Sequence, residues 1–175
     1  MRDDLCSNSP PELIRHQEQK IMEVLVKQAI DMLFTNDIFL LENDVNERTI
    51  THKLAEYLQD AFANWHVDCE YNRYCQNSEL LKKTLILPRH SKKVNVDDLE
   101  AKTVYPDIIV HGRGTEFNLL VIEVKKSTST QSIDFDMLKL HQYKKELHYK
   151  YALFLTLGCG EDLSKKVEKY QVQWI

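Results

Sequence analysis

Apolar and polar positions in the second half of the chain predict two adjacent β-strands. The runs 105–111 and 118–126 are rich in Ile, Val and Leu, and a short segment with Gly112 and Gly114 separates them. Short connections that contain glycine close β-hairpins, so the pattern predicts an antiparallel pair. A third apolar run, 149–157, is nearly continuous and predicts a strand that is buried on both faces.

Helical spacing of apolar residues predicts helices before and between these strands. The segments 12–34, 46–61 and 133–147 carry apolar residues three or four positions apart. A helix that joins the strands at 118–126 and 149–157 implies a right-handed crossover, and therefore a parallel pair of strands.

Strict alternation at 67–73 predicts a further strand ahead of the hairpin. We therefore expect an α/β fold with a mixed central sheet, an α-β-β-β-α-β core flanked by helices, and an extra N-terminal helix. A last helix is expected over 162–170 and a short edge strand over 172–175.

The 175 residues are expected to form a single domain, 1–175, because this length suffices for one hydrophobic core. Within it we expect an N-terminal helical extension at 1–45, a core at 46–158, an insertion at 76–102, and a C-terminal helix and edge strand at 159–175.

Composition narrows the class of protein. A hydrophobic content of 43% suits a globular chain, and no apolar run reaches membrane length. The charged N-terminus is not expected to act as a signal peptide. The four cysteines are scattered without zinc-site spacing, so a cytoplasmic location with reduced thiols is expected. The net charge is −4, from 27 acidic and 23 basic residues, which argues against an extended grip on duplex DNA.

Charged residues interrupt the hairpin strands where apolar ones are expected. A three-residue loop that pairs Arg113 with Phe117 would place Asp107 opposite Glu123, and alternation would put Lys125 on the same face. Burying such charges costs free energy unless they are paired or bind a cation. The opposite face would then be filled by Ile108, Val110, Leu120, Ile122 and Val124.

Two interpretations of this cluster are open. In the first, Lys125 merely neutralises Glu123 in a structural ion pair on the sheet. In the second, Asp107 and Glu123 hold a hard cation such as Mg²⁺, which prefers oxygen ligands. Lys125 would then orient or deprotonate a water, or stabilise negative charge that develops on phosphorus.

Pro106-Asp107, a spacer of fifteen residues and then Glu123-Val124-Lys125 resemble the motif of the PD-(D/E)XK nuclease superfamily. The resemblance covers about 46–158 and is closest in pattern to resolvase-like members. It implies a restriction-endonuclease-like fold and hydrolysis of phosphodiester bonds that depends on Mg²⁺ or Mn²⁺. Nucleic acid, with DNA expected, would be the substrate, in a repair, recombination or defence setting.

The resemblance also assigns roles to residues outside the hairpin. Glu47, at the start of the helix 46–61, matches an acid that helps to bind metal in resolvase-like members, although acids also favour first turns because of the helix dipole. Glu56 is the alternative acid and is expected on a solvated helix face. The expected substrate contacts are Lys126, Lys139 and Gln142, and the main-chain carbonyl of Val124 is a further candidate metal ligand.

Several side chains could contact phosphate or simply face solvent. The basic segments 82–83 and 89–93 lie in the expected insertion, and Glu70 and Arg73 lie on the polar face of the strand 67–73. Two other classes of protein also stay open: a non-catalytic nucleic-acid- or protein-binding module on a nuclease-like scaffold, and a structural subunit. A homodimer or a partner protein is compatible with each.

Overall fold

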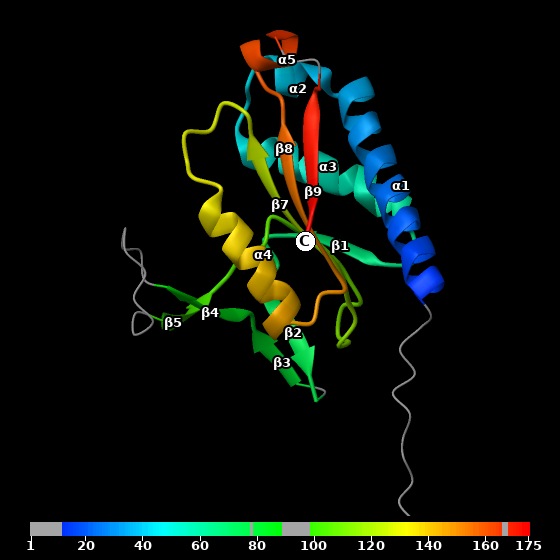
Figure 1. The fold of residues 1–175 in the computed structure, drawn as a ribbon, viewed down its shortest axis with the longest axis vertical. Coiled ribbons are helices and arrows are strands. Elements are labelled where there is room, and N and C mark those ends of the chain that lie inside the picture. The colour runs from blue at the N-terminus through cyan, green and yellow to red at the C-terminus, as the bar shows by residue number, and fades with distance from the viewer. Residues whose placement is uncertain (1–11, 78, 89–98, 166–167) are drawn as a thin grey trace, which may run out of the picture.

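A five-stranded mixed sheet forms the centre of the molecule, as the computed structural model shows for residues 12–77, 79–88, 99–165 and 168–175 (Figure 1). Within these ranges β7 and β8 run parallel, and the other neighbouring strands run antiparallel. The strands of this sheet, in their order across it, are β1 (His66–Cys69), β6 (Ile108–His111), β7 (Asn118–Lys126), β8 (Tyr151–Leu157) and β9 (Tyr170–Trp174).

The β6–β7 hairpin has the predicted register but a different turn. Ile108 lies opposite Ile122 and Val110 opposite Leu120, as expected, whereas a bulge after Val110 then places His111 opposite Asn118. The Gly112 N–H donates to the Phe117 carbonyl at 2.9 Å, so the predicted pairing of Arg113 with Phe117 is wrong. The bulge absorbs the difference in loop length and keeps the strand register.

Helix α4 (Asp134–Glu146) makes the predicted crossover between β7 and β8. The apolar run before Gly158 forms β8, in which all side chains except Thr156 are buried. A strand with apolar residues on both faces needs cover on both sides, and α4 covers one of them.

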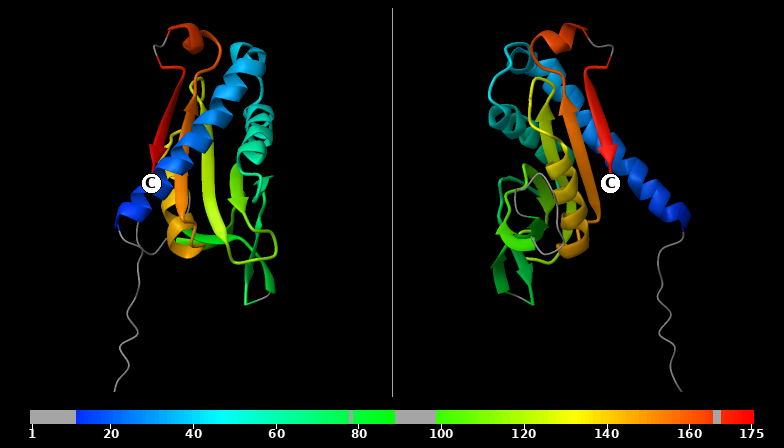
Figure 2. Two further views of the ribbon diagram at one scale, coloured as in Figure 1. Left: turned by 90° about the vertical axis from the view of Figure 1, so that its right-hand side faces the viewer. Right: turned by 60° about the vertical axis from the view of Figure 1, so that its left-hand side comes forward.

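Helices lie on both faces of the sheet (Figures 1 and 2). On one face α1 (Glu12–Asn36), α2 (Ile38–Glu42) and α3 (Glu47–Ala61) enclose a core with the predicted apolar side of the hairpin. On the other face α4 packs Leu140 and Tyr143 against alternate residues of the same strands. The second face is the one that also receives the charged hairpin residues. The first core contains Ile108, Val110, Leu120, Ile122 and Val124.

Four short strands stand between β1 and β6, where the sequence predicted an insertion at 76–102. They pair as two small antiparallel sheets, β2 (Arg73–Gln76) with β3 (Glu79–Lys82) and β4 (Thr84–Pro88) with β5 (Leu99–Thr103). The basic segment 89–93 lies outside the described residues.

The predicted strand over 67–73 is interrupted. β1 ends at Cys69 because Glu70 adopts a left-handed conformation with φ of 51°, and β2 begins only at Arg73. Alternation of residue types continues through this bend, so the sequence pattern carried no sign of it.

The C-terminal elements are shifted from their predicted positions. The expected helix over 162–170 is the short α5 (Glu161–Lys165), and the expected edge strand is β9, which starts at Tyr170 and pairs with β8. Among the helices of the described ranges, none has both the length and the apolar character that a bilayer-spanning segment requires.

Candidate active site

Three predicted residues converge on the face of the sheet that α4 covers. Asp107 directly precedes β6, and Glu123 and Lys125 occupy alternate positions on β7, so both side chains of β7 point to the same face. The Val124 N–H donates a hydrogen bond to Asp107 Oδ2 at 2.8 Å, which ties Asp107 to the strand that carries the other two residues. The register of the hairpin therefore assembles the predicted group.

The two carboxyl groups are in an environment that disfavours negative charge. Glu123 is 2% exposed, and burial together with the nearby charge of Asp107 raises its pKa to about 8. Burial also raises the pKa of Asp107, although the hydrogen bond from Val124 opposes the rise. Two carboxyl groups this close in a poorly solvated site repel when both are ionised, and a cation would relieve that repulsion.

Lysines from β7 and α4 supply positive charge to this site. Lys139 Nζ lies 2.5 Å from Glu123 Oε2 and 2.9 Å from Asp136 Oδ1. Lys125 Nζ lies 2.9 Å from Asp136 Oδ2. Lys125 thus pairs with Asp136. In place of the first interpretation, in which Lys125 neutralises Glu123 directly, the site holds a network of two lysines and two acids.

Asp136 is the residue of this site to which the sequence assigned no role. It is buried on α4, one turn before Lys139, so both side chains point to the same side of the helix. The available signal was the spacing of Asp136, Lys139 and Tyr143, which places an acid, a lysine and a large apolar ring on one helix face. A buried face that carries an acid requires a cationic partner.

One carboxylate oxygen in the site has no partner. Glu123 Oε1 is buried and has no hydrogen-bond partner of good geometry among the described residues, and the Tyr143 hydroxyl, which also lacks such a partner, lies beside this carboxyl. Its neighbour Oε2 is bound by Lys139, so the Glu123 carboxyl is satisfied on one side only. A buried acceptor left in this state needs a proton, a water or a cation.

Glu47 reaches the edge of the site from the first turn of α3. The Asn46 side chain caps this helix by accepting from the Arg48 N–H at 2.9 Å, and Glu47 Oε2 accepts from the Lys126 N–H at 3.0 Å. Glu47 and Asp107 line the same cavity of about 160 Å³, whose rim carries the Arg48–Glu70 ion pair. Its lining residues are Glu47, Arg48, Thr51, His52, Cys69, Glu70 and Asp107.

The alternative acid Glu56 faces solvent, as the sequence predicted. It is exposed on α3 and pairs with Lys53 and His52 of the same helix. Such exposed pairs contribute little free energy, so Glu56 has no part in the site.

The acids of the site provide two of the ligands that Mg²⁺ prefers. Within the part of the chain that the structure describes, no three side chains of His, Cys, Asp or Glu stand close enough together to hold a metal ion, so Glu47 does not complete a three-acid group. Mg²⁺ commonly takes one or two protein carboxylates and fills its remaining positions with water and phosphate oxygens. Asp107 and Glu123 supply that number, and the partnerless Glu123 Oε1 is a suitable ligand atom.

Two of the three predicted substrate contacts, Lys126 and Lys139, are already paired inside the chain. Lys126 Nζ lies 2.9 Å from Asp44 Oδ1 and donates to the Val45 carbonyl at 2.9 Å, so it fastens the loop before α3. Lys139 is held by Glu123, as described above. Neither lysine presents a free ammonium group. Gln142 is half-buried on α4, and its Oε1 has no hydrogen-bond partner among the described residues.

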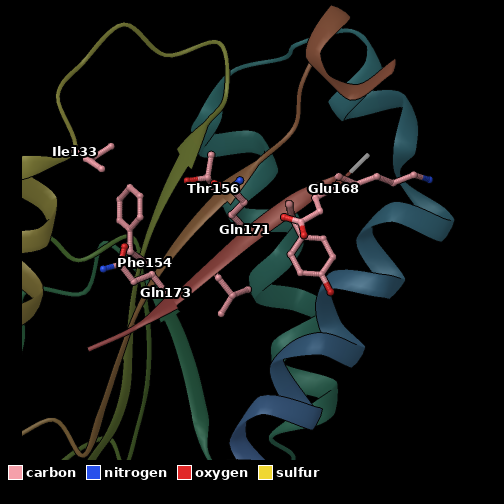
Figure 3. Close-up of a pocket in the computed structure, with 9 residues that line it drawn as sticks. Ile133, Phe154, Thr156, Glu168, Gln171 and Gln173 are labelled. Carbon is pink, nitrogen blue, oxygen red and sulfur yellow. The ribbon is translucent and has the colours of Figure 1, made fainter. Parts of the chain in front are cut away.

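A groove of about 670 Å³ lies over β8 and β9, and Figure 3 shows the residues that line it. Lys125 pairs in register with Thr156 of β8, which in turn pairs with Gln171 of β9. Adjacent strands are about 4.8 Å apart, so the groove begins one strand away from Lys125 and extends to the sheet edge. Its lining residues are Ile133, Phe154, Thr156, Glu168, Lys169, Tyr170, Gln171, Val172 and Gln173.

Lys83, predicted as part of a basic patch, is fully buried instead. Its Nζ donates to the Tyr71 carbonyl at 3.1 Å and lies 5.1 Å and 5.4 Å from the ring centroids of Tyr71 and Tyr149. Burial lowers the pKa of Lys83 to about 7. Burial rules out both alternatives for Lys83, a phosphate contact and a position facing solvent.

The chain was compared with protein-family models, with curated proteins and with solved structures, and none of them matches it.

Proposed function

We propose that this protein is a metal-dependent nuclease with a restriction-endonuclease-like fold, which hydrolyses phosphodiester bonds in nucleic acid. The observation that carries the proposal is the convergence of Asp107 and Glu123 from adjacent strands, with Glu123 Oε1 buried and partnerless. An acidic pair of this kind is costly in a structural role and useful where a divalent cation is bound.

The order of elements supports the same proposal. Helix α3, strands β1, β6 and β7, helix α4 and strand β8 follow one another in the α-β-β-β-α-β order that the sequence resemblance implies. The short strands β2–β5 are inserted between the first two core strands, and β9 extends the sheet at its far edge.

In the proposed mechanism Asp107 and Glu123 would hold Mg²⁺ or Mn²⁺, and Glu47 lies at the edge of the cavity that Asp107 also lines. A metal bound there would polarise the scissile phosphate and lower the pKa of a bound water. Lys125 stabilises the negative charge that develops on the phosphate oxygens, and Asp136 holds the Lys125 ammonium in position at 2.9 Å. Glu123 must give up its proton before it can act as a ligand, because burial keeps its pKa near 8.

The groove over β8 and β9 is the surface on which we expect the nucleic acid to lie. It adjoins Lys125 through Thr156, and it offers the amides of Gln171 and Gln173 as hydrogen-bond donors and acceptors. With a net charge of −4, binding is expected to rely on such local contacts more than on a broad basic surface. DNA is the proposed substrate and the cytoplasm the proposed location.

Cleavage assays test the proposal directly. Labelled single-stranded and duplex DNA and RNA would be incubated with the protein in Mg²⁺, in Mn²⁺ and in excess chelator. We expect cleavage that depends on metal and disappears in the Asp107→Asn variant, whereas Asp60→Asn, at an exposed acid of α3, keeps full activity. Equal activity of wild type and Asp107→Asn in Mg²⁺ would reject the proposed site.

A non-catalytic binding module on the same scaffold is the second candidate function. The observation that favours it is the pairing of both site lysines with acids, which satisfies most of the buried charge without a metal. Binding of oligonucleotides without cleavage under any metal condition would support this candidate.

A further inference from the structure

The ammonium group of Lys139 lies where it serves several acids of the site at once. It contacts Glu123 Oε2 at 2.5 Å and Asp136 Oδ1 at 2.9 Å, and its charge also stabilises the ionised form of Asp107. Most of this side chain is buried, with 15% exposure, and the Phe135 ring lies 5.9 Å from Nζ. Lys139 is therefore the resident cation of the acidic pair.

A second cation on Glu123 would be close to this ammonium. A divalent ion on Oε1 and the ammonium on Oε2 would lie only a few ångströms apart, and the two positive charges would repel each other in a poorly solvated site. Occupation of Glu123 by a metal and by Lys139 is therefore expected to be antagonistic.

The geometry of α4 provides a place for Lys139 when it leaves Glu123. Asp136 lies one helical turn before Lys139 and already binds it, so the ammonium can keep this partner while its contact with Glu123 breaks. Asp136 also binds Lys125, which stays in the site. The flexible four-carbon stem of lysine permits such a movement without displacement of the helix.

From these contacts we infer that Lys139 is an internal counter-ion that a divalent metal must displace from Glu123, so that α4 sets the metal affinity of the site. This inference rests on the proposed function, since it takes Asp107 and Glu123 as the metal ligands. The two can be tested separately, because removal of Lys139 is expected to strengthen metal binding whether or not the protein cleaves nucleic acid.

Mn²⁺ titration of the full chain, followed by electron paramagnetic resonance in the absence of nucleic acid, tests the inference. Lys139 also lowers the pKa of Glu123, so the titration is made above about pH 8.5, where a proton competes least with the metal. Under that condition we expect Lys139→Met and Lys139→Gln to bind Mn²⁺ at least about tenfold more tightly than wild type. Lys139→Arg keeps the positive charge and should retain the wild-type affinity. Lys145→Met, at an exposed lysine of the same helix, is the matched control and should leave the affinity unchanged.

A merely structural role for Lys139 would give the opposite result, because damage to the fold weakens binding. Unchanged or weaker Mn²⁺ binding in both neutral variants, or no Mn²⁺ binding by any of the proteins, overturns the inference. Tighter Mn²⁺ binding by the neutral variants, together with no cleavage of nucleic acid by the wild type, would support Lys139 as the counter-ion and reject the proposed nuclease function. Cleavage by wild type combined with weaker Mn²⁺ binding in the variants would reject the counter-ion alone.

A crystal of the wild-type protein soaked in Mn²⁺ tests the same inference without a substitution. We expect metal density between Asp107 and Glu123 with Lys139 Nζ beyond hydrogen-bond distance of Glu123 and still bound to Asp136. Metal density there with the Lys139–Glu123 contact intact, or no density, would overturn the inference.

Discussion

The main-chain N–H of Val124 donates a hydrogen bond to the carboxylate of Asp107 at 2.8 Å. Val124 stands between Glu123 and Lys125, so this single contact fixes the position of Asp107 relative to both of them. The side chain of Asp107 thus extends the β6–β7 pairing beyond the last main-chain pair, Ile108 with Ile122. The geometry of the candidate site follows from this local tie.

Substitution of Asp107 by Asn should separate its role in activity from its role in stability. The amide can still accept the Val124 hydrogen bond, but it lacks the charge that a metal requires. We expect metal-dependent cleavage to fall at least about 100-fold. Burial raises the pKa of Asp107, so the neutral side chain should leave the free energy of unfolding in urea unchanged or increase it by about 1 kcal/mol. A large loss of stability would contradict this account.

Metal affinity should increase with pH because a ligand carries a proton at neutral pH. Burial and the charge of Asp107 raise the pKa of Glu123 to about 8, from 4.5, so below pH 8 a metal must displace this proton. We expect the Mn²⁺ affinity of the wild type to rise by up to about tenfold per pH unit below pH 8 and to level off above it. Calorimetric titration with Mn²⁺ at several pH values below and above 8 measures how the affinity depends on pH. An affinity that does not change with pH would contradict a pKa of about 8 for Glu123.

Lys83 should make the stability of the protein depend on pH. Burial lowers its pKa in the folded chain to about 7 from 10.5, so the unfolded chain binds more protons between these values, and stability is expected to increase as the pH rises from 7 to 10.5. Lys83→Met should remove this dependence and raise the free energy of unfolding at pH 6.5 by roughly 2–3 kcal/mol. Urea unfolding across this pH range is the measurement.

The exposed neighbour Lys82 is the control for this experiment. Lys82→Met should change neither the stability nor its pH dependence. The account of Lys83 fails if the wild type and Lys83→Met respond to pH in the same way.

Removal of the groove amides should weaken nucleic-acid binding. In an Asp107→Asn background, which prevents cleavage, we expect the double substitution Gln171→Ala and Gln173→Ala to reduce the affinity for a short labelled oligonucleotide by about three- to tenfold. Fluorescence anisotropy measures the affinity. The same double substitution at the exposed Gln17 and Gln28 of α1 is the control. Equal losses of affinity in the two double variants would show that the nucleic acid does not bind in the groove.

The sequence was sufficient for those parts of the fold that depend on short-range periodicity. The register of Ile108 with Ile122 follows from the two-residue period of the hairpin strands, since a slip by one residue would expose the apolar face. Helix α4 and the parallel pairing of β7 with β8 follow from the crossover rule. The bend at Glu70 was missed because no glycine or proline marks it.

The charge network of the site was beyond what the sequence pattern could predict. Lys139 and Asp136 lie on a separate element, and their contacts with Glu123 and Lys125 depend on how α4 is placed over β7. The spacing of charged residues shows which faces carry charge, but it does not show which residues pair across two elements. Lys83 shows the same limit, because its aromatic surroundings come from Tyr71 and from Tyr149, which lies 66 residues further along the chain.

The bond between Asp107 and Val124 spans only 17 positions, whereas Lys139 belongs to the crossover that follows the hairpin. Contacts between near neighbours in the chain form early in folding, because they close short loops. We therefore expect Asp107 and Glu123 to approach each other in a hairpin that forms before α4 has docked. At that stage Lys139 is not yet in place to offset the repulsion between the two carboxylates. Dissolved divalent cations at that stage should speed refolding even though the finished protein has its own lysine in their place.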